Sequence, residues 1–216
     1  MIFSGYEPLD KYLLRDPSII VFFGSAGTGK TNVVFQILRC SSRAGIKGIY
    51  VSTEGVVYRN LVERWFKDLS NMLFAEAINE VDLIKLVNVL SLVDLPKGFI
   101  VAIDTINSFY RLLAADDVTY AIRYLSYVMA RLRELADQGI HVLLTAQIRE
   151  VGEGAEREIS GFKVIEFWSD RLVKIEADEA TKVRSLSTRL SENESLVINF
   201  KITDRGIIWV GHEHIK

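Results

Sequence analysis

The sequence contains few of the residues that build disulfide frameworks, metal sites or membrane spans. Its 216 residues include one cysteine, three prolines and three histidines. The single cysteine, Cys40, excludes a disulfide within the chain and is typical of a reducing compartment. No apolar run approaches the ~20 residues of a membrane-spanning helix, and the N-terminus lacks the basic start and apolar stretch of a signal peptide. We therefore expect a cytoplasmic protein with no membrane partner.

An excess of charge of one sign is also lacking. The 26 Lys and Arg residues nearly balance the 28 Asp and Glu residues, and the formal net charge is -2. Because a chain with this balance does not attract nucleic acid as a whole, any nucleic-acid binding must come from a local patch. No repeat, low-complexity tract or flexible linker interrupts the sequence. Residues 1–216 are therefore predicted to form a single domain.

Short apolar runs alternate with amphipathic stretches through most of the chain. Strands are expected at residues 18–23, 48–53, 72–77, 99–103 and 140–146, and helices at 29–43, 57–70, 80–92 and 118–137. This alternation predicts an α/β fold, in which a mainly parallel central sheet is flanked by helices on both faces. After Ser169 the pattern changes to strand-like segments at 171–176, 195–202 and 206–210, without helices between them. These segments are expected to form an antiparallel C-terminal extension of the sheet.

The most specific motif follows the first expected strand and opens the first expected helix. It fits the pattern GxxxxGK[ST] at every fixed position and consists of Gly24, Ser25, Ala26, Gly27, Thr28, Gly29, Lys30 and Thr31. Glycines let the backbone curl so that N–H groups point at phosphate oxygens, and the helix N-terminus adds positive potential at the same place. Lys30 is positioned for the β- and γ-phosphates, and the Thr31 hydroxyl for Mg²⁺. The motif predicts ATP and Mg²⁺ as ligands; a chance glycine-rich turn is the alternative.

Polar residues follow three other expected strands. Asp104, Glu54 and Gln147 each come directly after an apolar run or end one, at the sheet edge where ligands of open α/β sheets bind. We expect Asp104 to hold Mg²⁺ directly or through water. Glu54 follows a strand that is expected to neighbour the strand before the GxxxxGK[ST] motif, and from there it would orient or deprotonate the attacking water. Gln147 is positioned to sense the γ-phosphate. The alternatives are a turn cap for Asp104, a solvated loop residue for Glu54 and a strand cap for Gln147.

These elements, in this order, resemble the ATPase core of the RecA/RadA recombinase family. Residues 53–55 look like its [DS]TEG motif. More specific are residues 4–13, which look like its TG-x-x-x-LD-x-LL opening, residues 104–111, similar to its D-S-[LI]-T-x-x-[FY]-R run, and residues 202–207, similar to its IT-[DE]-[KR]-GI closing segment. The resemblance covers essentially the whole chain. It implies a RecA-like P-loop NTPase fold, a role in DNA recombination and repair, and an ATP site completed by a neighbouring subunit.

The sequence departs from full recombinases of this family in two respects. We expect residues 1–216 to comprise the ATPase core alone, without the N-terminal helical DNA-binding domain that the archaeal recombinases carry. Where the family's first DNA-binding loop has an arginine, this chain has Asp116 and Asp117, which repel phosphates. The closest resemblance is therefore to the archaeal RadA paralogs of the RadB or RadC type, which are short recombinase-like proteins.

The segment 149–163 corresponds to the second loop that lines the DNA channel in this family. Arg149, Arg157 and Lys163 are the candidates for phosphate contacts there, and Arg111 of the 104–111 run is a further DNA-binding candidate. Glutamates in the same loop offset these charges, so a solvated loop without a DNA role is the alternative. Single-stranded DNA is the expected partner, with the main recombinase, other paralogs or a second copy of the chain as further ones.

The function predicted from the sequence is a RadA paralog that binds ATP, hydrolyses it slowly, and binds single-stranded DNA or modulates the main recombinase. One alternative is a nucleotide-switched adaptor with little hydrolysis. Another is a clock-protein-like ATPase, although that group has paired glutamates where Glu54 is followed by Gly55. The residue that a neighbouring subunit contributes is not identified, and Lys174, Lys182 and Arg184 are the candidates.

Overall fold

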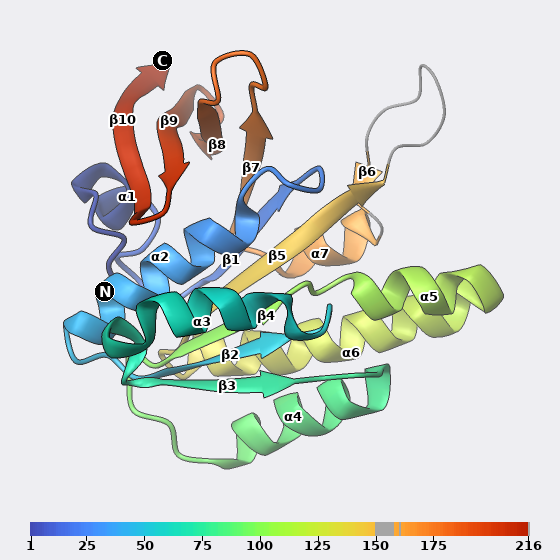
Figure 1. The fold of residues 1–216 in the computed structure, drawn as a ribbon. Helices are drawn as coiled ribbons and strands as arrows, with labels where there is room; N and C mark the ends of the chain where they lie inside the picture. Colours follow the sequence, from blue (N-terminus) through green and yellow to red (C-terminus); the bar gives the residue numbers. More distant parts are fainter. Residues whose placement is uncertain (150–157, 160, 216) are drawn as a thin grey trace.

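The fold is built on one sheet that runs through the whole molecule (Figure 1). The computed structural model describes residues 1–149, 158–159 and 161–215. The strands are β1 (Ile19–Gly24), β2 (Gly48–Ser52), β3 (Met72–Glu76), β4 (Ile100–Asp104), β5 (His141–Arg149), β6 (Glu158–Ile159), β7 (Arg171–Ala177), β8 (Arg184–Ser191), β9 (Glu194–Thr203) and β10 (Gly206–Ile215). The α-helices are α1 (Glu7–Tyr12), α2 (Lys30–Arg43), α3 (Arg59–Trp65), α4 (Glu80–Leu92), α5 (Ser108–Asp116), α6 (Val118–Asp137) and α7 (Phe162–Trp168), with 3-10 turns η1 (Val56–Tyr58) and η2 (Phe66–Leu69).

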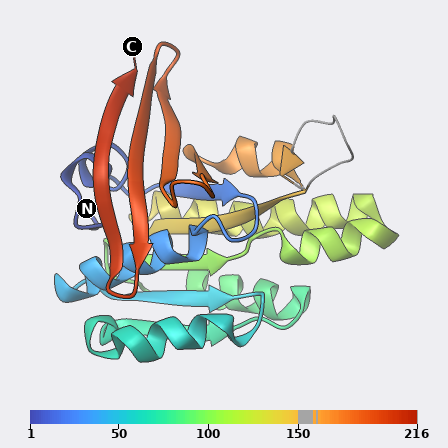
Figure 2. The ribbon, with the colours of Figure 1, turned by 45° about the horizontal axis from the view of Figure 1, so that its top comes forward.

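The strand order confirms the predicted fold class. The sheet runs β10-β9-β8-β7-β1-β5-β4-β2-β3, and β6 pairs with β5. The pairs that join β7, β1, β5, β4, β2 and β3 are parallel, whereas β8, β9 and β10 pair antiparallel. Figure 2 shows the C-terminal strands as one end of the sheet, with α1 beside them, where the Tyr6 ring stacks on Trp209 at 5.1 Å between centroids. None of the helices in the described ranges has the length and apolar character needed to cross a bilayer.

Two details of the expected sheet were wrong. The strand β7 belongs to the parallel part, because it pairs with β1, so the antiparallel extension starts at β8. The strand β2, which precedes Glu54, is not a neighbour of β1, because β5 and β4 lie between them. A crossover helix fixes the hand of a connection but not how many strands it passes, so the sequence order of strands does not give their spatial order.

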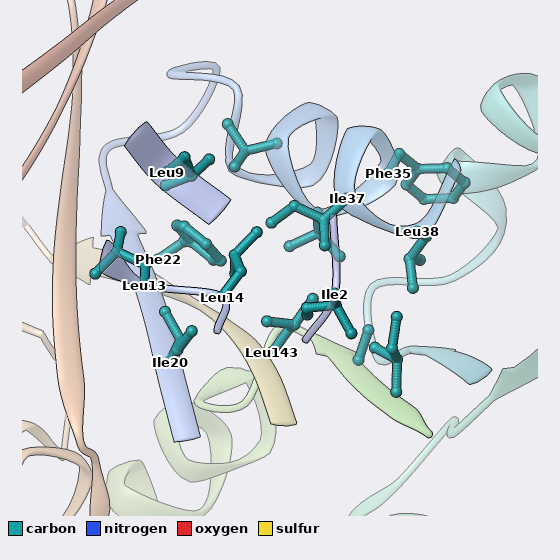
Figure 3. Close-up of a cluster of buried hydrophobic side chains, with 14 of the residues drawn as sticks. Ile2, Leu9, Leu13, Leu14, Ile20, Phe22, Phe35, Ile37, Leu38 and Leu143 are labelled. Atoms are coloured by element: carbon teal, nitrogen blue, oxygen red, sulfur yellow. The ribbon is translucent and has the colours of Figure 1, made fainter. Parts of the chain in front are cut away.

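Two hydrophobic clusters lie on the two faces of the sheet. Alternate residues of a strand point to opposite faces, and in β1 Ile20 and Phe22 face the α2 side, where they belong to one buried cluster with Phe35 and Ile37 (Figure 3). Ile19 of the same strand faces the opposite side, where α4, α5, α6 and α7 contribute buried residues. This sandwich fixes β1 and β5 in the interior, and with them the loops at their C-terminal ends.

The segment 57–70, expected as one helix, is instead divided among η1, α3 and η2. The backbone of Trp65 leaves helical geometry at φ -118° and ψ 22°. Trp65 and Leu69 are both buried in the cluster on the α2 side, and the Arg39 guanidinium lies over the Trp65 ring. The helix is interrupted where these two side chains become buried, and the local sequence pattern does not indicate that burial.

Candidate functional site

The GxxxxGK[ST] motif forms the turn between β1 and α2, at the C-terminal edge of the parallel strands (Figure 1). Gly27 and Gly29 have φ values of +78° and +102°, in the left-handed region that favours glycine. A Cβ at Gly29 would also lie 2.6 Å from Cδ1 of Ile202, and a Cβ at Gly24 would collide with the carbonyl oxygen of Ile175. The backbone therefore takes a curled path that other residues could not follow, as a phosphate cradle requires.

Lys30 begins α2 and points its side chain back over the turn. Its Nζ donates to the carbonyl oxygens of Gly24 at 3.0 Å and Ser25 at 2.8 Å, and the residue is only 8% exposed. Burial lowers the pKa of Lys30, and the negative charges of Asp104 and Glu54 offset part of that effect. The ammonium group is thus held within the turn, close to two carboxylates.

Asp104 ends β4 and is a buried carboxylate held by three hydroxyl groups. Its Oδ2 accepts from Thr31 Oγ1 at 2.6 Å and from the Tyr50 hydroxyl at 2.7 Å, and its Oδ1 accepts from Thr145 Oγ1. Burial raises the pKa of Tyr50, and the charge of Asp104 raises it further, so the phenol remains a donor. The sequence analysis missed Tyr50, because only the pairing of β2 with β4 brings this tyrosine to Asp104.

Thr31 and Asp104 have the donor set expected for magnesium. Mg²⁺ prefers hard oxygen ligands, keeps several waters and usually takes one or two protein carboxylates together with substrate phosphates. A hydroxyl and a carboxylate 2.6 Å apart fit that requirement. Within the described ranges, no group of three or more His, Cys, Asp or Glu side chains could hold a metal. The donors therefore fit an ion shared with a nucleotide rather than a metal held by protein alone.

Glu54 and Gln147 come from strands that are not adjacent, and Arg111 connects them. Glu54 Oε1 accepts from Thr105 Oγ1 at 2.9 Å and lies 3.6 Å from Arg111 Nη2. Arg111 Nη1 donates to Gln147 Oε1 at 2.6 Å, and the backbone N–H of Gln147 donates to Asn107 Oδ1 at 3.1 Å. The Glu54 side chain is 47% exposed, so it is held in place while remaining open to solvent. These contacts place Arg111, a DNA-binding candidate by sequence, beside Glu54 and Gln147.

A cavity of about 320 Å³ lies between the Gly24–Thr31 turn and the side chains of Glu54, Asp104 and Gln147. Its lining includes Ala26, Gly27, Gly29, Lys30, Thr31, Asn32, Glu54, Asp104, Thr105, Gln147, Arg184 and Ile202. A larger cavity of about 1360 Å³ adjoins it and is lined by Ser25 and Thr28 as well as by residues of β7, β8 and β9. The structure thus brings residues from β1, β2, β4 and β5, which the sequence analysis selected separately, to one cavity at one edge of the sheet.

The remaining DNA-binding candidates lie outside the lining of the two cavities or outside the described part of the chain. Lys163 lies on α7 with an exposed side chain. Arg149 ends β5, but its side chain, like the whole of Arg157, lies outside the described part of the chain. Asp117, one of the two acidic residues of the first loop, caps α6 by accepting from the Tyr120 amide at 3.0 Å. Its carboxylate therefore has a local structural role besides its charge.

The fold and the cavity define a class, the RecA-like P-loop core. No protein-family model matches the chain. Among solved structures, a RadB recombinase crystal structure matches 98% of this chain and 100% of its own, with a TM-score of 0.75 and 19% identity, which shows the fold.

Three curated proteins that share one name are similar to the chain over most of its length. The chain is 27% identical over 215 residues to the "DNA repair and recombination protein RadB" of Methanosphaera stadtmanae, covering 93% of this chain and 92% of the relative. The protein of the same name from Methanocaldococcus jannaschii is 27% identical over 198 residues, 88% of this chain and 92% of the relative. That from Thermoplasma acidophilum is 28% identical over 197 residues, covering 88% and 84%. These relatives confirm the predicted resemblance of the chain to RadA paralogs of the RecA/RadA family.

Proposed function

We propose that the protein is a RadA paralog that binds ATP with Mg²⁺, hydrolyses it slowly, and acts in DNA recombination and repair, with residues 1–216 working as one ATPase core. The observation that carries this proposal is the meeting of the curled Gly24–Thr31 turn with Glu54, Asp104 and Gln147 around one cavity. The names of the RadB relatives support a role in DNA recombination and repair.

In the proposed site, the turn and Lys30 bind the phosphates. Lys30 Nζ exchanges the carbonyl oxygens of Gly24 and Ser25 for β- and γ-phosphate oxygens, which are stronger acceptors because they are charged. Thr31 and Asp104 hold the Mg²⁺ ion, which supplies positive charge to offset that of the phosphates. The hydroxyl groups of Tyr50 and Thr145 keep the Asp104 carboxylate in place.

Glu54 is the proposed base for the attacking water. Thr105 and Arg111 fix its carboxylate beside the cavity, and its exposure lets it contact a water molecule. The water oxygen bonds to the γ-phosphorus, the bond to the bridging oxygen breaks, and a water proton passes to Glu54. Turnover is slow in an isolated protomer, because the family resemblance implies an ATP site that a neighbouring subunit completes. Gln147, held by Arg111, registers the γ-phosphate.

Single-stranded DNA and the main recombinase are the proposed partners, and a second copy of the chain is a further one. Lys163 is exposed on α7 and supports a DNA contact, whereas the exposed Asp116 and Asp117 oppose one at the α5–α6 corner. That acidic corner favours a second candidate, an adaptor that binds the recombinase while ATP acts as a switch. Binding of DNA and of a recombinase therefore have to be measured separately.

The test is ATP binding and turnover of the purified protein. Calorimetric titration with Mg²⁺-ATP is expected to show binding that Lys30→Ala abolishes, while Lys47→Ala, an exposed lysine at the opposite end of β2, leaves it unchanged. Normal affinity in Lys30→Ala would contradict the phosphate-cradle assignment. Turnover that single-stranded DNA stimulates at low salt and less at physiological salt supports the DNA-engaged enzyme. A slow rate indifferent to DNA supports the adaptor.

A further inference from the structure

Arg184 lies across the phosphate-binding turn, far from it in sequence. The residue opens β8, and its side chain lines both the 320 Å³ cavity and the larger cavity beside it. Measured from the Cβ position that Gly29 lacks, Arg184 Cδ is at 3.4 Å and Nε at 3.5 Å. These are contact distances, so the arginine side chain passes directly beside Gly29, and its Nε lies next to the same turn as Lys30.

The charge of Arg184 has no counter-ion within the described part of the chain. Its Nε is buried without a hydrogen-bond partner, and no carboxylate of the described ranges forms an ion pair with it. Lys174, which lines the same large cavity, pairs with Glu176 at 2.7 Å, and Arg111 pairs with Glu54 and Gln147. A buried donor left unpaired is costly, and a guanidinium group is suited to bind phosphate through parallel N–H donors. A bound anion beside the turn would therefore stabilise the unpaired guanidinium group.

We propose that Arg184 binds the phosphates of the nucleotide as a second cation beside Lys30, supplied by the same chain rather than by a neighbouring subunit. This inference rests on the proposed function, since it assigns a further residue to that site. Glu54 and Gln147 line only the smaller cavity, whereas Arg184 lies where the two cavities adjoin. Arg184 is therefore placed nearer the α- and β-phosphates than the γ-phosphate, and the larger cavity has room for ribose and base.

The same-chain assignment changes what is expected of the isolated protomer. By its sequence alone, Arg184 is a candidate that reaches the site of a neighbouring subunit. If it acts within its own chain, its contribution to nucleotide affinity is present in dilute protein, without self-association. Because the contact is with phosphates that ADP retains, it also contributes to ADP binding about as much as to ATP binding.

The experiment measures binding of Mg²⁺-ATP, Mg²⁺-ADP and inorganic tripolyphosphate at a protein concentration at which sedimentation shows monomers. Arg184→Ala is expected to weaken all three by about ten- to a hundred-fold, the usual effect of losing a hydrogen-bonded charge. Arg184→Lys is expected to retain part of the affinity. The matched control is Arg189→Ala, which removes an exposed arginine from the same strand and leaves binding unchanged. Arg184→Gln replaces the alanine variant if the latter does not fold.

Several results would overturn the assignment. Wild-type affinity in both Arg184→Ala and Arg184→Gln would remove the residue from the site. A loss confined to adenine nucleotides, with tripolyphosphate binding unchanged, would mean a base contact instead. A loss that appears only at concentrations where protomers associate would mean action on a neighbouring subunit. Absence of ATP binding by the wild type would overturn the proposed function itself, whereas the first three results leave that function intact.

Discussion

Replacing Tyr50 by phenylalanine tests whether the buried hydroxyl contacts of Asp104 stabilise the site. The Tyr50 hydroxyl donates to Asp104 Oδ2 at 2.7 Å, and Tyr50 is 1% exposed. The substitution removes this one donor. The ring itself keeps its contacts with Phe35 and Tyr58, whose centroids lie 4.8 and 5.3 Å away. The change therefore isolates the hydrogen bond from the packing.

The expected loss follows from the burial and charge of the acceptor. A hydrogen bond to a charged group contributes about 1.5–3 kcal/mol, and Asp104, which is 6% exposed, has little access to water that could replace the lost donor. Asp104 still accepts from Thr31 and Thr145 after the change, so the carboxylate is not left without donors. We expect the free energy of unfolding to fall by about 2 kcal/mol.

Urea unfolding without nucleotide or Mg²⁺ measures this loss, as a lower midpoint with an unchanged slope. The matched control is Tyr58→Phe. The Tyr58 hydroxyl donates to Glu76 at 3.0 Å, but Glu76 also pairs with Arg59 and is 26% exposed at the side chain, so water can replace the donor. A smaller loss is expected for Tyr58→Phe. In addition, Tyr50→Phe should need more Mg²⁺ for ATP binding, because Asp104 is less well held.

Two results would refute this reasoning. If Tyr50→Phe unfolds at the wild-type midpoint, the hydroxyl contributes nothing to the buried carboxylate. If both tyrosine variants lose the same stability, burial of Asp104 does not distinguish the two contacts. In the second case an unchanged Mg²⁺ requirement would also remove Tyr50 from the metal-binding arrangement.

Three further predictions concern turnover, DNA and pH. Glu54→Gln is expected to keep ATP affinity and to lower turnover about 10²-fold or more; a phosphate-release assay that shows unchanged turnover would remove Glu54 as the base. Replacing Arg149 and Arg157 by glutamate is expected to weaken single-stranded DNA binding, measured by fluorescence anisotropy, and to flatten its salt dependence by ~0.7 for each phosphate that is no longer neutralised; if neither changes, this loop is not the DNA site. Burial lowers the pKa of His141 from 6.5 to about 4, so the folded state binds fewer protons than the unfolded state in that interval. Stability is then fully present above pH 6.5 and falls by up to about 3 kcal/mol as the pH drops to 4, and His141→Leu should flatten this loss in urea titrations across that range.

The sequence predicted the nucleotide motif and most strands because their signals are local. The turn Gly24–Thr31 follows from residue spacing, and β1, β4 and β5 follow from short apolar runs buried on both faces. The expectation that Glu54, Asp104 and Gln147 lie at one edge needed only that the strands be parallel, since parallel strands share their C-terminal edge. The helices α1, α5 and α7 were missed, because they span only 6, 9 and 7 residues, and the strand β8 was missed, because only Leu186 and Leu190 are apolar in it.

Only the tertiary structure decided which side chains meet at that edge. The order β1-β5-β4-β2 separates Glu54 from the P-loop strand, yet Thr105 and Arg111 hold its carboxylate beside the cavity. The contacts of Tyr50 with Asp104 and of Arg184 with the turn join segments far apart in the chain. Residue types and local spacing determined the chemistry of the turn, because backbone conformation there is set by its own glycines. The partners of each charged side chain depend on strand register and crossover, which local sequence does not encode.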